Sequence, residues 1–147
     1  MSLADWAKNG WLRTHRPSKA EITNLLEIVE RDLKDANAKG ISDDWKFGIA
    51  YNAALKLCTI LLHSSGYRTE KNLAHYRTLQ ALPLILGDQH KSNADYLDTC
   101  RKKRNETEYD LAGNVSKDEV QELLDFCQEL KTEVTAWLEK NQKSLRD

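Results

Sequence analysis

The chain has 147 residues, of which 22 are Lys or Arg and 23 are Asp or Glu, so its formal net charge is −1. This length suits one domain with a hydrophobic core of its own. The near-neutral total excludes a globally basic nucleic-acid-binding protein, although a local basic patch is compatible with it. Six Gly and two Pro provide few turns, which argues against an all-β sandwich or barrel. We therefore expect a mostly helical, single-domain protein.

The cysteines and the apolar runs favour an intracellular protein. Cys58, Cys100 and Cys127 are odd in number and far apart, so we expect buried thiols rather than disulfides. No stretch approaches the ~18 consecutive apolar residues of a membrane span. The N-terminus lacks the layout of a signal peptide. The expected location is the cytoplasm, without a membrane partner.

The first 17 residues are expected to form a short helix and a linker. Leu3, Trp6 and Ala7 share one helical face, and Gly10 is placed to end the helix. The run Thr-His-Arg-Pro that follows is typical of a linker. We expect residues 18–147 to form the helical domain.

Two long helices follow, each with a capping serine. Ser18 is expected to cap the first, with Glu21 bonding back to the cap N–H as in a capping box, and Gly40 ends this helix. Ser42 is expected to cap the second, which Gly66 ends. The broad apolar surface of the second helix suits the centre of a bundle or an additional interface. Its expected apolar positions are Trp45, Phe47, Ile49, Ala50, Ala53, Ala54, Leu57, Cys58, Ile60 and Leu61.

A third helical pattern runs from Leu73 to Leu82 and then meets Pro83. Proline removes a backbone donor and clashes with the preceding turn, so we expect a break or a kink there. Ser92 is expected to open the next helix, and the Gly113-Asn114 pair to end it.

The last helix opens at Ser116, with a second Ser-x-x-Glu capping box at Glu119. No segment alternates with the period of two that indicates a strand. The expected fold is therefore all-α: an antiparallel four-helix bundle of the up-down type, with a short additional N-terminal helix.

One charged segment, residues 101–110, contains the candidate functional residues. Each helical residue advances by about 100°, which places Arg104 between Leu97 and Leu111 on the apolar stripe of its helix. An arginine there is costly unless it is paired or opens onto a cleft. A structural ion pair with Glu108, one turn further on, is the first interpretation.

An anion or phosphate site is the second interpretation. The planar guanidinium of Arg104 suits phosphate, and Asn105 adds hydrogen-bonding groups beside it. Arg101 follows on the same side of the helix, whereas Lys102 projects elsewhere. Both are candidate contacts to a nucleic-acid backbone.

These residues give the chain a resemblance to the HEPN domain, the small all-helical family of prokaryotic toxin–antitoxin and defence modules. The resemblance is carried by Arg104-Asn105, Tyr109-Asp110 and the Gly113-Asn114 turn. Ala50-Tyr51-Asn52-Ala53-Ala54 and Gly66-Tyr67-Arg68 support it, and it spans roughly residue 18 to the C-terminus. In ribonucleases of this family, two arginine–histidine motifs meet across a symmetric dimer and cleave RNA without a metal.

The family motif carries over to this chain in part. Arg104 matches the arginine and Asn105 the polar position, but Tyr109 stands where the family has histidine. Histidine, with a pKa near ~6.5, suits proton transfer at neutral pH, whereas tyrosine, near ~10, stays protonated and is a poor base. The resemblance thus implies a phosphate-binding site with weak or no nuclease activity. Some relatives carry a tyrosine that a partner nucleotidyltransferase modifies, at the place where this chain has Leu111.

The remaining motifs offer few candidates. His15, His63, His75 and His90 show none of the spacings of helical metal sites, so no metal and no cofactor are expected. His75 follows the 66–68 loop and is a supporting candidate because it could reach a cleft. No Walker, dinucleotide-binding or Gly-x-Ser-x-Gly motif is present in the sequence.

Three functions are open at this point. In a nucleic-acid- or nucleotide-binding module, Arg104 would grip phosphate, Asn105 would orient it and Tyr109 would donate a hydrogen bond. In a metal-independent ribonuclease, Tyr109 or His75 would replace the missing histidine. In a structural or partner-binding bundle, Arg104 and Glu108 would neutralise each other. A two-fold homodimer is expected, with RNA or a nucleotide, an antitoxin and a nucleotidyltransferase as candidate partners.

Overall fold

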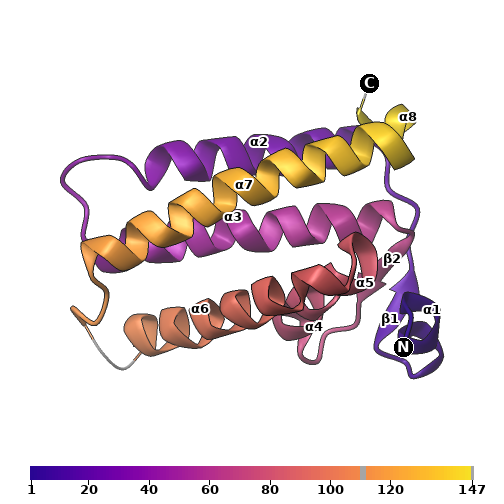
Figure 1. The fold of residues 1–147 in the computed structure, drawn as a ribbon, viewed down its shortest axis with the longest axis horizontal. Coiled ribbons are helices and arrows are strands. Elements are labelled where there is room, and N and C mark those ends of the chain that lie inside the picture. The colour runs from indigo at the N-terminus through magenta and orange to yellow at the C-terminus, as the bar shows by residue number, and fades with distance from the viewer. Residues whose placement is uncertain (110–111, 147) are drawn as a thin grey trace.

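The computed structural model describes residues 1–109 and 112–146. Within these ranges the chain is mostly helical, and four long helices dominate it (Figure 1). They are α2 (Lys19–Asp35), α3 (Asp43–Ser64), α6 (Lys91–Tyr109) and α7 (Lys117–Asn141). The shorter helical elements are α1 (Leu3–Lys8), α4 (Ala74–Gln80), α5 (Leu82–Leu86), the 3₁₀ helix η1 (Asp88–His90) and α8 (Lys143–Arg146).

The helix α3 lies in the middle of the molecule. It packs against α2, α6 and α7, and the shorter elements α4, α5 and β2 also contact it. Its buried side chains include Tyr51, Leu57 and Ile60, which are no more than 1% exposed. A helix that is apolar on all sides belongs in a core. This confirms the expectation that the second long helix is central.

Two capping serines stand where the sequence predicts them. The hydroxyl of Ser42 accepts a hydrogen bond from the Trp45 N–H at 3.1 Å. At the start of α7, Ser116 accepts from the Glu119 N–H at 3.1 Å, and the Glu119 carboxylate accepts from the Ser116 N–H at 3.0 Å. Each cap satisfies backbone donors that have no partner within the helix, and this fixes where the helix begins.

At the start of α2 the capping serine is confirmed, but the predicted capping box is not formed. Ser18 accepts from the Glu21 N–H at 3.1 Å, as a capping serine does. The Glu21 carboxylate, however, does not close the expected capping box and contacts His15 and His63 instead. Two imidazoles near one carboxylate outcompete the single backbone N–H of the cap.

The third helical pattern is broken between α4 and α5. Pro83 lies in the first turn of α5, where its missing N–H costs no intrahelical hydrogen bond. The next long helix, α6, begins at Lys91, one residue before the predicted Ser92, directly after η1. The predicted end of this helix at 113–114 follows residues 110–111, which lie outside the described part of the chain.

A small antiparallel sheet, which the sequence analysis did not predict, joins the N-terminal segment to the bundle. Strand β1 (Leu12–Thr14) pairs with β2 (Tyr67–Thr69). The register places Leu12 opposite Thr69, Arg13 opposite Arg68 and Thr14 opposite Tyr67. Strands of three residues are too short to show an alternating pattern. Leu12 and Trp6 also pack with Leu62 of α3 in a small apolar cluster.

The state of the three cysteines is as the sequence predicts. Cys58, Cys100 and Cys127 are buried and free. Burial raises the pKa of the Cys58 and Cys127 thiols to about 12 and that of Cys100 to about 11, so all three are protonated thiols at neutral pH. None of the helices in the described ranges is both long enough and apolar enough for a membrane crossing.

Candidate functional site

A cavity of about 480 Å³ lies at the start of α3, between α2 and α6. Arg31 and Asp32 line it from α2, Trp45 and Asn52 from α3, and Arg104 from α6. The other lining residues are Ser42, Asp44, Gly48, Ile49 and Thr107. The cavity thus brings together side chains from three long helices, and it includes the arginine that the sequence singles out.

Arg104 is half-buried and lies against α3. A Cβ added to Gly48 would be 4.0 Å from the Arg104 Cγ, an ordinary contact distance, so the arginine stem lies beside this turn of α3. The guanidinium carbon lies 5.9 Å from the centre of the Tyr51 ring, within cation–π range. Its Nη1 donates a long hydrogen bond of 3.5 Å to the Asn105 Oδ1. The aliphatic part of the Arg104 side chain therefore packs beside α3, and its guanidinium lies at the cavity.

Asp32 forms part of the opposite wall and is only 5% exposed. Its Oδ1 accepts from Arg31 Nε at 3.1 Å and Nη2 at 2.9 Å, and its Oδ2 accepts from Asn52 Nδ2 at 2.6 Å. These three bonds compensate the removal of the carboxylate from water. The cavity wall is therefore a polar network with fixed geometry.

Trp45 borders the cavity and is 67% exposed, which corrects the prediction that it belongs to the apolar stripe of its helix. It lies in the first turn of α3, beside the cavity, where the indole is not covered by a neighbouring helix. In the same turn, Asp44 Oδ2 accepts the Gly113 N–H at 2.8 Å. This bond holds the segment before α7 against the start of α3.

The other predicted site residues lie elsewhere. Four of them are not among the described residues that line the cavity: Asn105, Arg101, Lys102 and His75. Arg101 Nε donates to Asp98 Oδ1 at 2.8 Å, and Lys102 Nζ is 3.5 Å from Asp98 Oδ2. Arg101 and Lys102 are thus both paired with Asp98, a carboxylate about one turn earlier on α6.

His75 lies near Tyr51, the same ring that the Arg104 guanidinium approaches. Its ring centre is 6.5 Å from that of Tyr51. Although the residue is exposed overall, burial of part of its ring lowers the pKa of His75, and the cations Arg104, Lys56 and Arg101 lower it further. His75 is therefore neutral at pH 7 and able to accept a proton.

Two predicted residues fall at the end of α6. Tyr109 is the last residue of that helix, but its side chain and that of Glu108 lie outside what the structure describes. The hydrogen-bonding role of Tyr109 and the pairing of Glu108 with Arg104 stay predictions. Thr107, just before them, lines the cavity, and its hydroxyl has no hydrogen-bond partner among the described residues.

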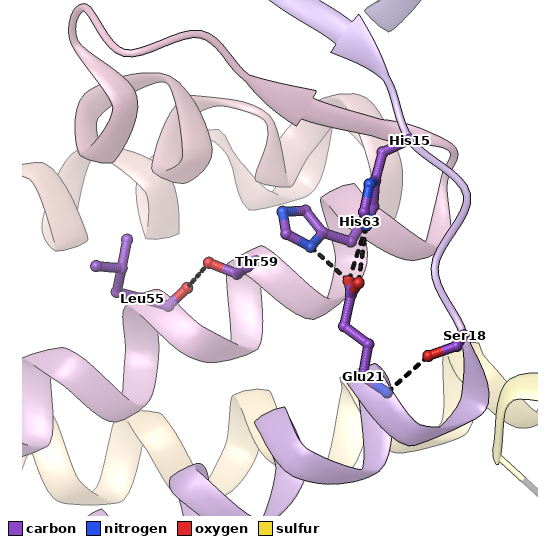
Figure 2. A network of polar contacts seen from close by, with 6 residues as sticks. All are labelled: His15, Ser18, Glu21, Leu55, Thr59 and His63. Atoms are coloured by element: carbon purple, nitrogen blue, oxygen red, sulfur yellow. Dashed lines mark hydrogen bonds and ion pairs between the residues drawn. The ribbon is translucent and has the colours of Figure 1, made fainter.

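A second polar cluster, which the sequence analysis missed, lies at the other end of α3. Figure 2 shows His15, from the segment after β1, and His63, from the last turn of α3, both pointing at the Glu21 carboxylate. His15 Nε2 is 2.9 Å from both Glu21 oxygens, and His63 Nδ1 is 2.8 Å from Oε2. The two imidazoles meet edge to face, with ring centres 4.6 Å apart.

The charges in this cluster are set by burial and by the shared hydrogen bonds. Burial alone would raise the pKa of Glu21, but the bonds from His15 and His63 outweigh it and hold this pKa below its ordinary value. Burial lowers the pKa of His63, and the opposing effect of Glu21 does not restore it. The carboxylate is therefore ionised at neutral pH and faces two imidazoles.

The cluster was invisible in the sequence because its members are far apart in it. Glu21 is 6 residues from His15 and 42 from His63, and neither interval is a helical metal-site spacing. The strand pairing and the packing of α2 on α3 bring them together. A glutamate at the third position of a capped helix, with a histidine shortly before it, was the available signal.

Comparison of the chain with protein-family profiles, with curated proteins and with solved structures found no match. The resemblance to HEPN domains therefore stays a prediction from the sequence, carried by residues 104–105, 109–110 and 113–114, with residues 50–54 and 66–68 in support. What the cavity at Arg104 does has to be argued from its chemistry.

Proposed function

We propose that the chain is a HEPN-like nucleotide- or nucleic-acid-binding module, of toxin–antitoxin or defence type, in which Arg104 anchors a phosphate. The supporting observation is that the half-buried Arg104 lines a cavity of about 480 Å³. An arginine that served only to balance a charge inside the bundle would need no such cavity. This favours the binding hypothesis over the purely structural one.

The groups around the cavity match the parts of a nucleotide. The guanidinium of Arg104 offers a planar fork for phosphate oxygens. The exposed indole of Trp45 offers a face on which a base stacks, and such contacts contribute about 1–3 kcal/mol. Asn52 and Thr107 supply hydrogen-bonding groups for a sugar or a base edge.

The charge balance of the cavity favours one bound nucleotide unit over a long coated strand. Two guanidiniums, those of Arg31 and Arg104, are offset by the carboxylates of Asp32 and Asp44. Recognition would then depend on hydrogen-bond geometry more than on a broad positive field. The net charge of −1 for the whole chain agrees with this.

The proposal includes the assembly that the HEPN resemblance implies. The long helices would form an up-down four-helix bundle, and a two-fold homodimer would bring two Arg104 cavities around one groove. The module would act in the cytoplasm, with an antitoxin or a nucleotidyltransferase as protein partner. Sedimentation equilibrium is expected to give twice the 16.9 kDa mass of the chain, and a monomer at all concentrations would remove this part of the proposal.

Binding of fluorescein-labelled single-stranded RNA of mixed sequence, and of AMP and ADP by intrinsic Trp fluorescence, tests the function. Arg104→Ala is expected to weaken binding by roughly tenfold or more, because a charge-assisted pair is lost. Arg104→Lys keeps the charge but not the fork, so it should recover affinity in part. Lys140→Ala removes a similar charge from an exposed position at the far end of α7 and should bind as the wild type does.

Binding that is equal in Arg104→Ala and Lys140→Ala would contradict the proposal. Absence of binding by the folded wild type, together with lower stability of Arg104→Ala, would favour the structural hypothesis. Circular dichroism and denaturant unfolding of every variant separate loss of binding from loss of fold.

A ribonuclease that uses Arg104 is the second candidate, and it is favoured by His75, which lies outside the cavity lining but close enough for the charge of Arg104 to lower its pKa. His75 lies within electrostatic reach of Arg104 and is neutral at pH 7, so it has the protonation state of a general base. Incubation of the RNA pool with chelator present is expected to show cleavage that His75→Gln and Arg104→Ala abolish. Intact RNA with the wild-type protein would leave binding as the function.

A further inference from the structure

The cluster of His15, Glu21 and His63 has the dimensions of a metal site. One potential ligand atom from each side chain lies within 4.8 Å of the other two. The contacts of the imidazole nitrogens with the carboxylate are 2.8 and 2.9 Å. Around a tetrahedral Zn²⁺ with bonds of about 2.0–2.1 Å, ligand atoms are roughly 3.3 Å apart. The two nitrogen–oxygen distances are thus within about half an ångström of this separation, and the ligand nitrogens of the two imidazoles lie within 4.8 Å of each other.

The donor set is that of a site with an open position. Two imidazoles and one carboxylate provide three ligands, and the fourth position is left for water or another ligand. The side chains of His15 and His63 are 17% exposed and that of Glu21 is 31% exposed. The cluster is therefore held by protein on most sides and still has access to solvent, as binding and release of an ion require.

Each ligand is positioned by contacts outside the cluster. The His15 N–H donates to the Gly66 carbonyl at 2.8 Å, which continues the pairing of β1 with β2. Glu21 is fixed at the start of α2 by the Ser18 cap. His63 lies on the buried helix α3. Backbone held in this way lowers the entropy cost of forming a coordination site.

The arrangement also has a simpler interpretation, in which the imidazoles only donate hydrogen bonds to the carboxylate. Both interpretations use His15 Nε2 and His63 Nδ1, because these nitrogens face Glu21 (Figure 2). In the hydrogen-bonded form these nitrogens carry the N–H groups that bond to Glu21, and a metal ion bound at them would leave the proton of each neutral ring on its other nitrogen. The two interpretations therefore differ in whether the cluster binds a metal ion and in which ring nitrogens then carry the protons.

We propose that His15, Glu21 and His63 form a binding site for a divalent transition-metal ion such as Zn²⁺. The site is independent of the nucleotide cavity, because Gly48 and His63 are about 15 residues, or roughly 22 Å, apart along α3. Its ion ties three segments together: the one after β1, the start of α2 and the end of α3. Failure of either proposal therefore leaves the other intact.

Calorimetric titration of chelator-treated full-length protein with ZnCl₂ tests the site. We expect one bound Zn²⁺ per chain and a higher Tm in the presence of Zn²⁺. Co²⁺ in place of Zn²⁺ should give d–d absorption without intense thiolate bands, because the three thiols are buried and protonated.

The variants are chosen to keep the hydrogen bonds and remove the ligands. In His15→Gln the amide N–H replaces the Nε2 donor, and in His63→Asn it replaces the Nδ1 donor. Each is expected to lower Zn²⁺ affinity by at least tenfold while keeping the fold. His75→Gln is the matched control, since it also removes one histidine, outside the cluster, and it should bind Zn²⁺ as the wild type does.

Equal Zn²⁺ affinity in wild type, His15→Gln and His63→Asn would overturn the proposal, as would folded wild-type protein that binds no Zn²⁺ or Co²⁺. Nitrogen-edited NMR of the wild type keeps the test decisive if a variant misfolds. Zn²⁺ should then shift the ring nitrogens of His15 and His63 and leave those of His90 in place. Shifts confined to other histidines would contradict the assignment.

Discussion

Asp32 is a buried carboxylate that receives hydrogen bonds from two helices. Arg31 approaches it from its own helix, and Asn52 reaches it from α3. Asp32→Ala would leave the Asn52 amide without this partner, so we expect a loss of about 1–3 kcal/mol of unfolding free energy. Urea denaturation measures it. Asp35→Ala, at an exposed position of the same helix, should stay within about 0.5 kcal/mol of the wild type.

The pKa of His75 tests whether the Arg104 guanidinium lies close to the His75 ring. Burial of part of the ring and the neighbouring cations lower this pKa below its ordinary value. Arg104→Gln removes one of the cations, so the pKa of His75 should rise toward about 6.5. NMR titration of the imidazole protons measures both values. An unchanged pKa would mean that the arginine lies elsewhere in solution.

The same shift sets the sign of a pH effect on stability. The folded state binds the His75 proton less readily than the unfolded chain does. The stabilisation is therefore complete above the unfolded pKa of about 6.5 and decreases as the pH falls toward the lower folded value. His75→Gln should remove this part of the acid sensitivity, as followed by thermal unfolding at a series of pH values.

Glu21 and Trp45 show why single residues are hard to assign from the sequence. The Ser-x-x-Glu pattern at Ser18 correctly predicted a helix start, because the cap is made within four residues. It could not predict that the Glu21 side chain turns to histidines on two other elements. Trp45 was assigned to the apolar stripe from its spacing alone. The spacing does not show whether a neighbouring helix extends far enough to cover the side chain, and none covers most of Trp45.

At the scale of the element, Gly48 is the residue of α3 that lies beside the stem of Arg104 on α6. An added Cβ would lie 4.0 Å from Arg104 Cγ, which is an ordinary contact. Gly48→Ala should therefore stabilise the protein by about 0.5–1 kcal/mol, the usual gain inside a helix, and keep nucleotide binding. Gly48→Leu should displace the arginine stem and weaken binding, as measured by RNA anisotropy. Equal binding by both variants would contradict this placement of Arg104.

Elements with local signals were predictable, and those that need distant partners were not. The starts of α2, α3 and α7 depend on serines that cap within three residues. The break before Pro83 is equally local. The strands β1 and β2 exist because residues 12–14 and 67–69 meet across the chain, and three residues carry no pattern of their own.

At the scale of the whole molecule, the N-terminal segment is an integral part of the packing. Trp6 and Leu12 are buried in a cluster with Leu62. A chain that begins at Ser18 should lose at least about 3 kcal/mol of unfolding free energy, since each large apolar side chain contributes roughly 1.5–3 kcal/mol. Urea unfolding measures it. An unchanged midpoint would instead make residues 18–147 a unit that folds alone.

Both candidate sites combine residues from several elements, and the sequence alone does not predict which elements meet. Arg104 was found because a charge in an apolar stripe is a local anomaly. Its cavity was not, because the walls come from α2 and the start of α3. The histidine cluster was missed for the same reason. Both sites are products of tertiary structure, although each contains one residue with a local signal.

Because α3 is enclosed by its neighbours, its backbone amides cannot meet water without disassembly of the whole bundle. In hydrogen–deuterium exchange, the middle of α3 should therefore exchange at the rate of global unfolding, while frayed ends exchange sooner. One end of this helix lies at the Arg104 cavity and the other carries His63. A ligand at either end would slow exchange along the same helix by mass action. The protection of these amides thus reports occupancy of both sites with a single probe.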